Sequence, residues 1–270
     1  MSKLSFLIVI PNYNNARWLD NCFSSIYAQT NDYFYSIVFI DDYSTDNSIK
    51  IAEKWSEKFC HSGWGVDFDI VKNEKKKWNG GSRNAARESW LWGTQDYIIF
   101  LDSDGWFADG DCLKSIGDAL EQNNYPDLLR LSYCILVDDH LTTVDMSDQK
   151  TIERIVSDQN VACWTKCVKT EKLVPFPENT LMEDVVQHIK QLDNVETVAS
   201  ISKGIVVWNR NNKNSCSRDE TLQNGKWKSS LYRYYADLLD LEVNKPECKA
   251  ELERRRKIAL ENIKNDRFVQ

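Results

Sequence analysis

Two carboxylates, Asp102 and Asp104, directly follow the apolar run Tyr97–Leu101. Acids this close repel each other unless a cation or a proton lies between them. Mg²⁺ and Mn²⁺ typically bind one or two carboxylates and complete their coordination with water and substrate phosphates. The pair therefore indicates a divalent-metal site, and a solvated turn after a strand is the alternative.

Two more segments could bind parts of a phosphorylated ligand. Asp41–Asp42 follows the apolar run Ser36–Ile40, and a carboxylate there can accept a hydrogen bond from a base N–H or a ribose hydroxyl. Gly80–Gly81 and Arg83 combine a flexible backbone, a predicted helix start and a cation, which suits an anion such as diphosphate. The alternatives are a turn with a helix cap and an ordinary glycine pair.

Glu183 and Asp184 open another predicted helix, after Phe176–Asn179. Acids in a first helical turn complement the helix dipole. Helix stabilisation therefore explains these two residues on local grounds without any chemistry.

Short apolar runs alternate with helical periodicity over the first hundred residues. The predicted strands are Leu4–Ile10, Ser36–Ile40, Phe68–Val71 and Tyr97–Leu101. The predicted helices have inner faces within Trp18–Tyr27 and Ile51–Phe59, and a third opens at Gly80. This alternation predicts an α/β fold with a mainly parallel sheet and helices on both faces. Ligands bind at the carboxyl ends of such strands, where the acidic clusters fall.

The pattern changes after Trp106. We expect a helix over Cys112–Gln122, a strand over Leu128–Val137, a polar stretch over 138–148 and a strand over Ile201–Trp208. From Asn211 the chain turns polar and then becomes helical and charged.

Composition limits the class of protein. The chain has 270 residues, of which 42% are hydrophobic, which is enough for a sizeable core. Its net charge of −7 counts against a protein that holds nucleic acid mainly by neutralising phosphates. No apolar run approaches the roughly 20 residues of a membrane span, so we expect a soluble, cytoplasmic protein. The eight cysteines and three histidines lack metal-ligand spacing, which disfavours a structural zinc site.

Taken together, the motifs resemble the inverting family 2 glycosyltransferases of the GT-A fold. The matching segments occur in the family's order over roughly residues 4–215: Ile10–Asn14, Ile40–Asp46, Gly81–Asn84, Phe100–Asp104, Trp164–Lys166, Phe176–Glu178 and Met182–Val185. The chain departs from the family at Tyr43, where glycine is usual, and at Gly105, where another acid often follows.

The resemblance implies a GT-A (Rossmann-like) fold with three parts. Residues 1–105 would form the nucleotide-sugar-binding half, 106–215 the acceptor and catalytic half of the same domain, and 216–270 a helical C-terminal extension. The activity implied is transfer of a hexose or pentose from a nucleoside-diphosphate sugar, expected to be a UDP-sugar.

The resemblance also assigns the donor and metal residues. Asp104 would be the principal ligand of Mn²⁺ or Mg²⁺, and Asp102 would bind the ribose, the metal or a metal-bound water. Asp42 would hold the base, and Arg83 would face the donor sugar or phosphate. The rest of the donor site would comprise Pro11 and Tyr13 beside the base and Lys213 in a segment that closes over the diphosphate.

On the catalytic side, Asp184 matches the family's general base, and Glu183 is its neighbour and substitute. Such a carboxylate takes the proton of the acceptor hydroxyl as it attacks the anomeric carbon. Trp164 and Trp208 would stack on acceptor rings, with Arg210 beside them; a place in the core or in a surface loop is the alternative for these three.

The expected acceptor is a glycan or a lipid-linked saccharide. The alternative is a hydroxylated DNA base, reached through a basic surface of Lys75–Lys77 and Arg254–Lys257. The same C-terminal run could dock on an anionic membrane or be a solvated helix. Other functions that fit the motifs are a non-catalytic nucleotide-sugar-binding protein and a nucleotidyltransferase, although the latter's basic glycine-rich loop is missing from Pro11–Asn14.

Overall fold

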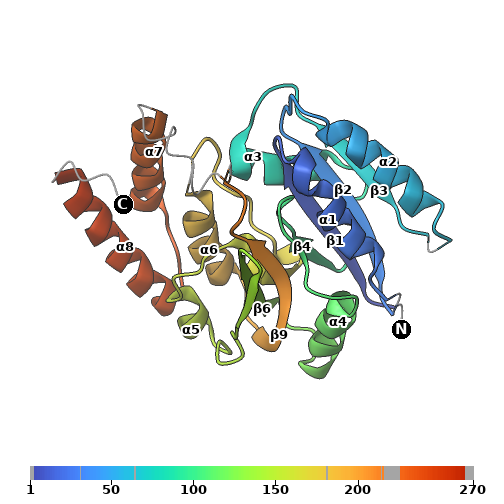
Figure 1. Cartoon of the computed structure of the whole chain (residues 1–270). Coiled ribbons are helices and arrows are strands. Elements are labelled where there is room, and N and C mark those ends of the chain that lie inside the picture. Colours follow the sequence, from blue (N-terminus) through green and yellow to red (C-terminus); the bar gives the residue numbers. More distant parts are fainter. Residues whose placement is uncertain are drawn as a thin grey trace.

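The computed structural model describes residues 3–30, 32–63, 65–180, 182–213, 215 and 226–264, with the backbone alone for 226–230 (Figure 1). Its first half is a parallel sheet in the order β3-β2-β1-β4. The strands are β1 (Ser5–Asn12), β2 (Phe34–Asp41), β3 (Phe68–Lys72) and β4 (Tyr97–Phe100). β1 and β2 are apolar and buried on both faces, as expected for central parallel strands. The four predicted strands are confirmed.

Helices cover both faces of this sheet. Against one face lie α1 (Ala16–Tyr27), α2 (Ser48–Cys60) and α4 (Cys112–Gln122), which share the largest apolar core with β1 and β2. Against the other lies α3 (Trp78–Ala85), followed by the 3₁₀ turn Ala86–Glu88. The α/β class with helices on both faces is therefore confirmed.

The first turns of α1 and α2 share one capping side chain. The N-cap positions are Asn15 for α1 and Asn47 for α2, and neither side chain caps its own helix. Instead, the Asp46 carboxylate accepts hydrogen bonds from the N–H groups of Ala16 and Ser48, each at 2.9 Å. One acid thus serves the first turns of both helices and ties their N-termini together.

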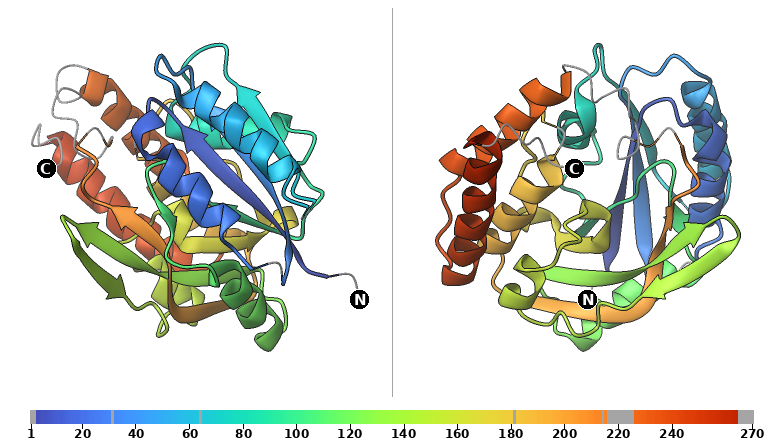
Figure 2. Two further views of the ribbon diagram at one scale, coloured as in Figure 1. Left: turned by 45° about the vertical axis from the view of Figure 1, so that its right-hand side comes forward. Right: turned by 60° about the vertical axis from the view of Figure 1, so that its left-hand side comes forward.

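The second half of the chain continues the same sheet with mixed strand directions. It adds β5 (Trp106–Phe107), β6 (Leu128–Val137), β7 (His140–Val144), β8 (Lys166–Lys169) and β9 (Val198–Asn209). β8 runs antiparallel to β4 and β6, β9 runs parallel to β6, and β7 forms a hairpin with β6. The parallel part of the sheet is therefore confined to the first half and to the β6–β9 pair. The sheet curls, so that β6 and β9 run across the direction of β1 and β2 (Figure 2).

β7 falls in the stretch predicted to be polar and irregular. Its residues are almost all exposed, so the segment lacks the alternation of a half-buried strand. The shorter elements of this half are α5 (Ile152–Val156) and the 3₁₀ turns Cys163–Thr165 and Thr170–Lys172.

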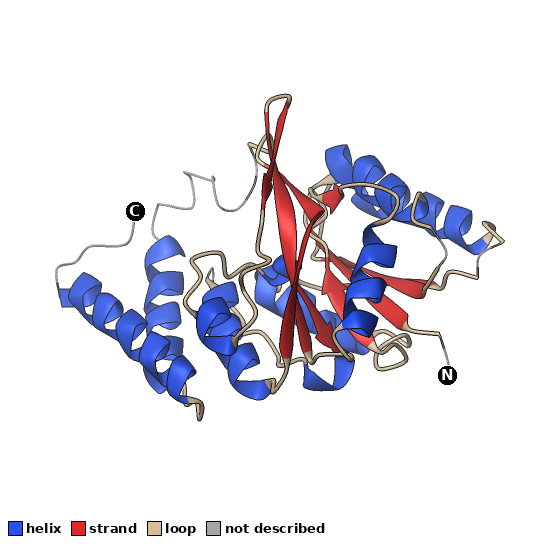
Figure 3. Cartoon of the chain, turned by 90° about the horizontal axis from the view of Figure 1, so that it is seen from below, coloured by secondary structure: helices blue, strands red, loops and turns tan. Residues whose placement is uncertain are grey.

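The C-terminal helices build a second core at the end of the molecule opposite the N-terminus (Figures 1 and 3). α7 (Lys226–Asp240) and α8 (Pro246–Lys264) pack against each other and against α6 (Glu183–Asn194). Leu238, Cys248 and Leu252 are buried here beside Ile189 of α6. The helical extension is confirmed, and it supports the helix that begins with Glu183 and Asp184. The predicted limits at 105/106 and 215/216 stay predictions.

Within the described residues, none of the helices combines the length and the apolar character needed to cross a bilayer.

The arginines Arg254–Arg256 of α8 form ion pairs with other residues of the same chain. Arg254 and Arg255 pair with Glu251 at 2.7 and 2.6 Å. Arg256 pairs with Glu253 and donates to the carbonyl groups at the end of α7. Arg256 therefore braces α7 against α8, and docking of the basic run on a membrane or on DNA stays a prediction.

Replacing Arg256 with Met should lower the free energy of unfolding by about 2 kcal/mol, because carbonyls at the end of α7 lose a charged donor. Urea denaturation measures the change. Lys257→Met, at the exposed next position, is the matched control and should change stability by less than about 0.5 kcal/mol. Equal urea-denaturation midpoints for the two variants would contradict the bracing role of Arg256.

Candidate active site

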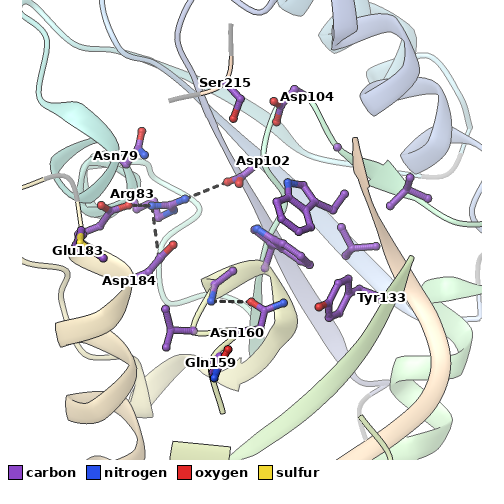
Figure 4. A pocket seen from close by; sticks show the side chains of 18 residues that line it. Asn79, Arg83, Asp102, Asp104, Tyr133, Gln159, Asn160, Glu183, Asp184 and Ser215 are labelled. Carbon is purple, nitrogen blue, oxygen red and sulfur yellow. Dashed lines mark hydrogen bonds and ion pairs between the residues drawn. The ribbon is translucent and has the colours of Figure 1, made fainter. Parts of the chain in front are cut away.

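Two connected hollows lie at the carboxyl edge of the parallel strands. The main cleft has a volume of about 730 Å³, and a small pocket beside it has about 120 Å³. Five residues line both of them: Asn79, Arg83, Asp102, Asp104 and Ser215. Figure 4 shows these residues at one end of the main cleft, with Glu183 and Asp184 facing Arg83.

The small pocket gathers the three residues that were predicted to surround the base. Pro11 and Tyr13, from the end of β1, line it together with Asp42, from the end of β2. The ammonium of Lys76 lies 3.3 Å from the centre of the Tyr13 ring and 4.5 Å from that of Trp78. The Lys76 ammonium therefore lies against both rings, of which only Tyr13 lines the pocket.

Asp42 holds the start of α3. Its carboxylate accepts hydrogen bonds from the backbone N–H groups of Lys77 at 2.7 Å and Trp78 at 2.9 Å, and from the Asn73 amide at 2.8 Å. Tyr43, where glycine is usual in the family, has φ of +68°, a left-handed conformation that glycine adopts without strain. The sequence alone gave no sign of these backbone partners.

The glycine pair does not form the predicted anion cradle. α3 begins at Trp78, and Gly80 and Gly81 lie within it. A Cβ on Gly80 would lie 2.1 Å from the Pro177 carbonyl oxygen and 3.3 Å from the Glu183 Cβ. The N–H groups at the helix start already bind Asp42. The glycine therefore allows α3 to approach the segment before α6 closely. The predicted helix start at Gly80 was wrong, and binding of a diphosphate by this segment stays a prediction.

Arg83 stands at the centre of the site. Its guanidinium is 3% exposed and lies 2.5 Å from Glu183, 3.0 Å from Asp102 and 3.8 Å from Asp184 (Figure 4). One permanently charged group thus faces carboxylates from β4 and α6. Their attraction to it offsets the repulsion among three acids in one place.

The two acids that open α6 differ in environment. Glu183 has a side chain only 3% exposed, whereas that of Asp184 is 24% exposed and one of its oxygens has no hydrogen-bond partner. Burial and the neighbouring Asp184 raise the pKa of Glu183, and the Arg83 guanidinium opposes that rise. Glu183 is therefore fixed as the partner of Arg83, whereas Asp184 is the more exposed of the two acids and lies farther from the guanidinium.

Asp102 and Asp104 fit a divalent cation by their chemistry. Burial raises the pKa of Asp102 against the effect of Arg83, and burial together with Asp102 raises the pKa of Asp104 to about 6. Two carboxylates that resist ionisation side by side gain from a cation between them. Asn212 orients Asp104 through a 2.7 Å hydrogen bond. No cluster of three or more acidic, histidine or cysteine side chains suited to a metal occurs among the described residues, so water and ligand would complete the coordination.

Gly105, the second departure from the family, is explained by packing. A Cβ at this position would lie 3.0 Å from the Val207 carbonyl oxygen of β9 and 3.4 Å from that of Asp102. A larger residue would push β9 away from the turn that carries Asp102 and Asp104.

The other end of the main cleft is aromatic. Trp164 packs edge-on against Tyr133 at 5.1 Å between ring centres and lies 6.1 Å from Trp208. All three line the cleft, although Trp164 is largely a core residue. Arg210 covers the Trp208 ring at 5.0 Å without lining the cleft.

Lys213 is exposed and lines neither hollow. Sequence reasoning also missed Asn79, Asn212 and the loop residues 159–162, which lie in segments without a recognisable pattern.

Glu183→Ala should lower the free energy of unfolding by about 3 kcal/mol, because it leaves the buried Arg83 charge with one close partner fewer. Asp184→Asn, which removes a half-exposed and more distant charge, should cost less than about 1 kcal/mol. Chemical denaturation of both variants measures these changes in the free energy of unfolding. Similar losses would mean that the two acids are equivalent in the fold.

Comparison with known proteins agrees with this architecture. The family model described as glycosyl transferase family 2 matches residues 7–133. The poly(ribitol-phosphate) beta-glucosyltransferase of Bacillus spizizenii is 29% identical over 110 residues, which are 40% of this chain and 16% of the relative. The chain thus spans a small part of that protein.

Solved structures share the fold at low identity. TarS from S. aureus (residues 1–349, with UDP-GlcNAc) superposes with a TM-score of 0.70 and 19% identity over 92% of this chain and 70% of that one. The mannosyltransferase PcManGT from Pyrobaculum calidifontis, with GDP-Man and Mn²⁺, gives 0.64 and 15% over 94% and 69%. Residues 7–133 thus match glycosyl transferase family 2, and the shared architecture shows that the chain has the GT-A fold.

Proposed function

We propose that this chain is an inverting, metal-dependent glycosyltransferase that moves a sugar from a UDP-sugar to a hydroxyl group of a glycan or lipid-linked saccharide. The observation that carries the proposal is the arrangement around Arg83. This residue joins Asp102 of the acidic pair to Asp184, the more exposed acid of α6, across one cleft. Donor and acceptor can therefore meet between two sets of carboxylates with different roles.

On the donor side, Asp104 and Asp102 would hold Mn²⁺ or Mg²⁺, which supplies positive charge for the leaving diphosphate. Pro11, Tyr13 and Asp42 would surround the base in the small pocket. Asp42 retains one lone pair, on Oδ2, for a base N–H, because Asn73 and two backbone groups at the start of α3 use the others. Base binding and the position of α3 would thereby be linked.

On the acceptor side, Asp184 would be the general base. The acceptor oxygen bonds to the anomeric carbon while the bond from that carbon to the diphosphate oxygen breaks, and the hydroxyl proton passes to Asp184. Attack from the face opposite the diphosphate inverts the anomeric centre. Glu183 is unsuited to this role because it is buried and hydrogen-bonded to Arg83 at 2.5 Å.

The names and bound ligands of the similar proteins support the donor class. TarS structures hold UDP-GlcNAc and UDP, and PcManGT holds GDP-Man and Mn²⁺. The curated relative is named for a glucosyl transfer and a polyol-phosphate polymer. These names favour a nucleoside-diphosphate sugar as donor and a polymer as acceptor for this chain.

Two features favour a saccharide acceptor over DNA. One end of the cleft is aromatic, and the basic side chains already have partners within the chain. Tyr133, Trp164 and Trp208 offer ring faces and edges of the kind on which sugars stack. Lys77 pairs with Glu88 at 2.9 Å, and Lys76 lies on Tyr13 and Trp78. With Arg254–Arg256 also engaged, these cations have partners other than a nucleic-acid backbone.

Calorimetry of UDP, GDP, CDP and ADP, each with and without Mn²⁺, tests the donor site. We expect UDP to bind best and only with the metal. Affinity should fall about tenfold from pH 7 to pH 5, because a carboxyl group with a pKa of about 6 changes from mostly ionised to mostly protonated over that range. Asp104→Asn should remove both the metal effect and this pH dependence. Metal-independent binding of UDP would overturn the metal assignment.

Asp184→Asn should leave the dissociation constant of UDP with Mn²⁺ within about twofold of its original value while lowering turnover of the donor about 10³-fold, the scale of a lost general base. Release of UDP from UDP-glucose and UDP-GlcNAc measures turnover. Asp193→Asn, in the last turn of the same helix, is the control and should retain turnover. Retained turnover in Asp184→Asn would shift the role of base to another group.

A further inference from the structure

Two buried cations lie beneath the loop of residues 157–162, which we call the acceptor-side loop because its residues 159–162 line the main cleft opposite the donor carboxylates (Figure 4). Arg130 of β6 is 0% exposed, and Lys166 of β8 is 2% exposed. Charged groups are seldom buried so completely unless their hydrogen bonds are satisfied. The hydrogen-bond and ion-pair partners of these two cations therefore indicate their role in the structure.

The Lys166 ammonium donates to the carbonyl oxygens of Val161 at 2.7 Å and Ala162 at 3.1 Å. Both of these hydrogen bonds thus reach the backbone of the acceptor-side loop. Burial lowers the pKa of Lys166 to about 7, so placing an ammonium here carries a cost in free energy. An apolar residue would fill the same space without that cost, but it would leave the two carbonyls unpaired.

The Arg130 guanidinium holds the preceding part of the loop. It donates to the Asn160 carbonyl at 2.7 Å and pairs with the Asp158 carboxylate at 2.5 Å. Asp158 in turn accepts from the Asn160 N–H at 3.1 Å and from the Gln149 amide at 2.8 Å. Three successive carbonyl groups, those of 160, 161 and 162, are thus drawn toward cations in the core.

Thr165 completes the set. Its hydroxyl donates to the Ala162 carbonyl at 2.6 Å and also contacts Arg130. Trp164, which lies between the loop and Thr165 in the chain, belongs to the aromatic end of the cleft. The same polar network therefore fixes the loop and one wall of the aromatic end in a single arrangement.

We infer that Arg130 and Lys166 are positioning residues for acceptor binding: they hold the acceptor-side loop in a fixed shape and thereby set the affinity for the acceptor saccharide. This inference rests on the proposed function, because it takes the loop to contact the acceptor. Neither residue lines the cleft, so neither contacts a substrate directly.

Lys166→Met keeps the length of the side chain and removes its donors. Lys169→Met is the matched control: this lysine lies on the same strand and pairs with Asp127 at 3.2 Å, away from the cleft. A double variant, Arg130→Met with Asp158→Asn, removes both charges together so that no carboxylate is left buried and unpaired.

Hydrogen exchange followed by mass spectrometry measures directly how well the backbone amides of the loop are protected. In Lys166→Met and in the double variant, amides of 157–162 should exchange at least tenfold faster, with β1 and α3 unchanged. Lys169→Met should leave the loop as it is. Unchanged exchange in the loop, or a similar increase throughout the chain, would overturn the inference.

Kinetics with UDP-glucose, Mn²⁺ and methyl β-D-glucopyranoside as the probe acceptor supply the functional readout. The KM for the probe should rise at least tenfold in Lys166→Met, while hydrolysis of the donor and UDP affinity stay within twofold. A KM equal to that of the control, or a parallel loss of hydrolysis, would contradict a positioning role. If the unaltered chain turns over no donor, the proposed function fails, and hydrogen exchange still decides whether the cations hold the loop.

Discussion

The guanidinium of Arg83 is the cation on which the site is organised. It is buried between Asp102 at the end of β4 and the two acids that begin α6. Without it, three carboxylates would meet in a place shielded from water, where their mutual repulsion is strong. With it, Asp102 can lie in the turn after β4 while Asp184 lines the cleft from the start of α6. The two ends of the proposed reaction are therefore coupled through one side chain.

The rest of the fold keeps this arrangement in place. Asp42 anchors the start of α3, which carries Arg83, and Gly80 lets that helix approach the segment before α6. The C-terminal helices then cover α6 from outside with a core of their own. Arg256 joins them by donating to carbonyls of the α7 end. An extension with no catalytic motif thus has a physical role in the site, because it supports the helix that presents Asp184.

Much of the fold could be predicted because its signals are local. Buried parallel strands are continuous apolar runs, and the polar residues after them must meet at one sheet edge. β7 was missed because its exposed residues lack a pattern, and Gly80 was misread because close approach between helix and loop is a tertiary property. The different roles of Glu183 and Asp184 depend on burial, which adjacent acids in a sequence do not reveal. Arg130 did leave a signal, since it stands alone as a charge within an apolar strand.

The most direct test of the account is the anomeric configuration of the first product. With UDP-α-glucose or UDP-α-GlcNAc and Mn²⁺, donor hydrolysis is transfer to water, so proton NMR can follow it without knowledge of the acceptor. Attack assisted by Asp184 from the side opposite the diphosphate predicts that the β-anomer forms first and then mutarotates. An α-anomer as the first product would contradict the proposed roles of Asp184 and Arg83.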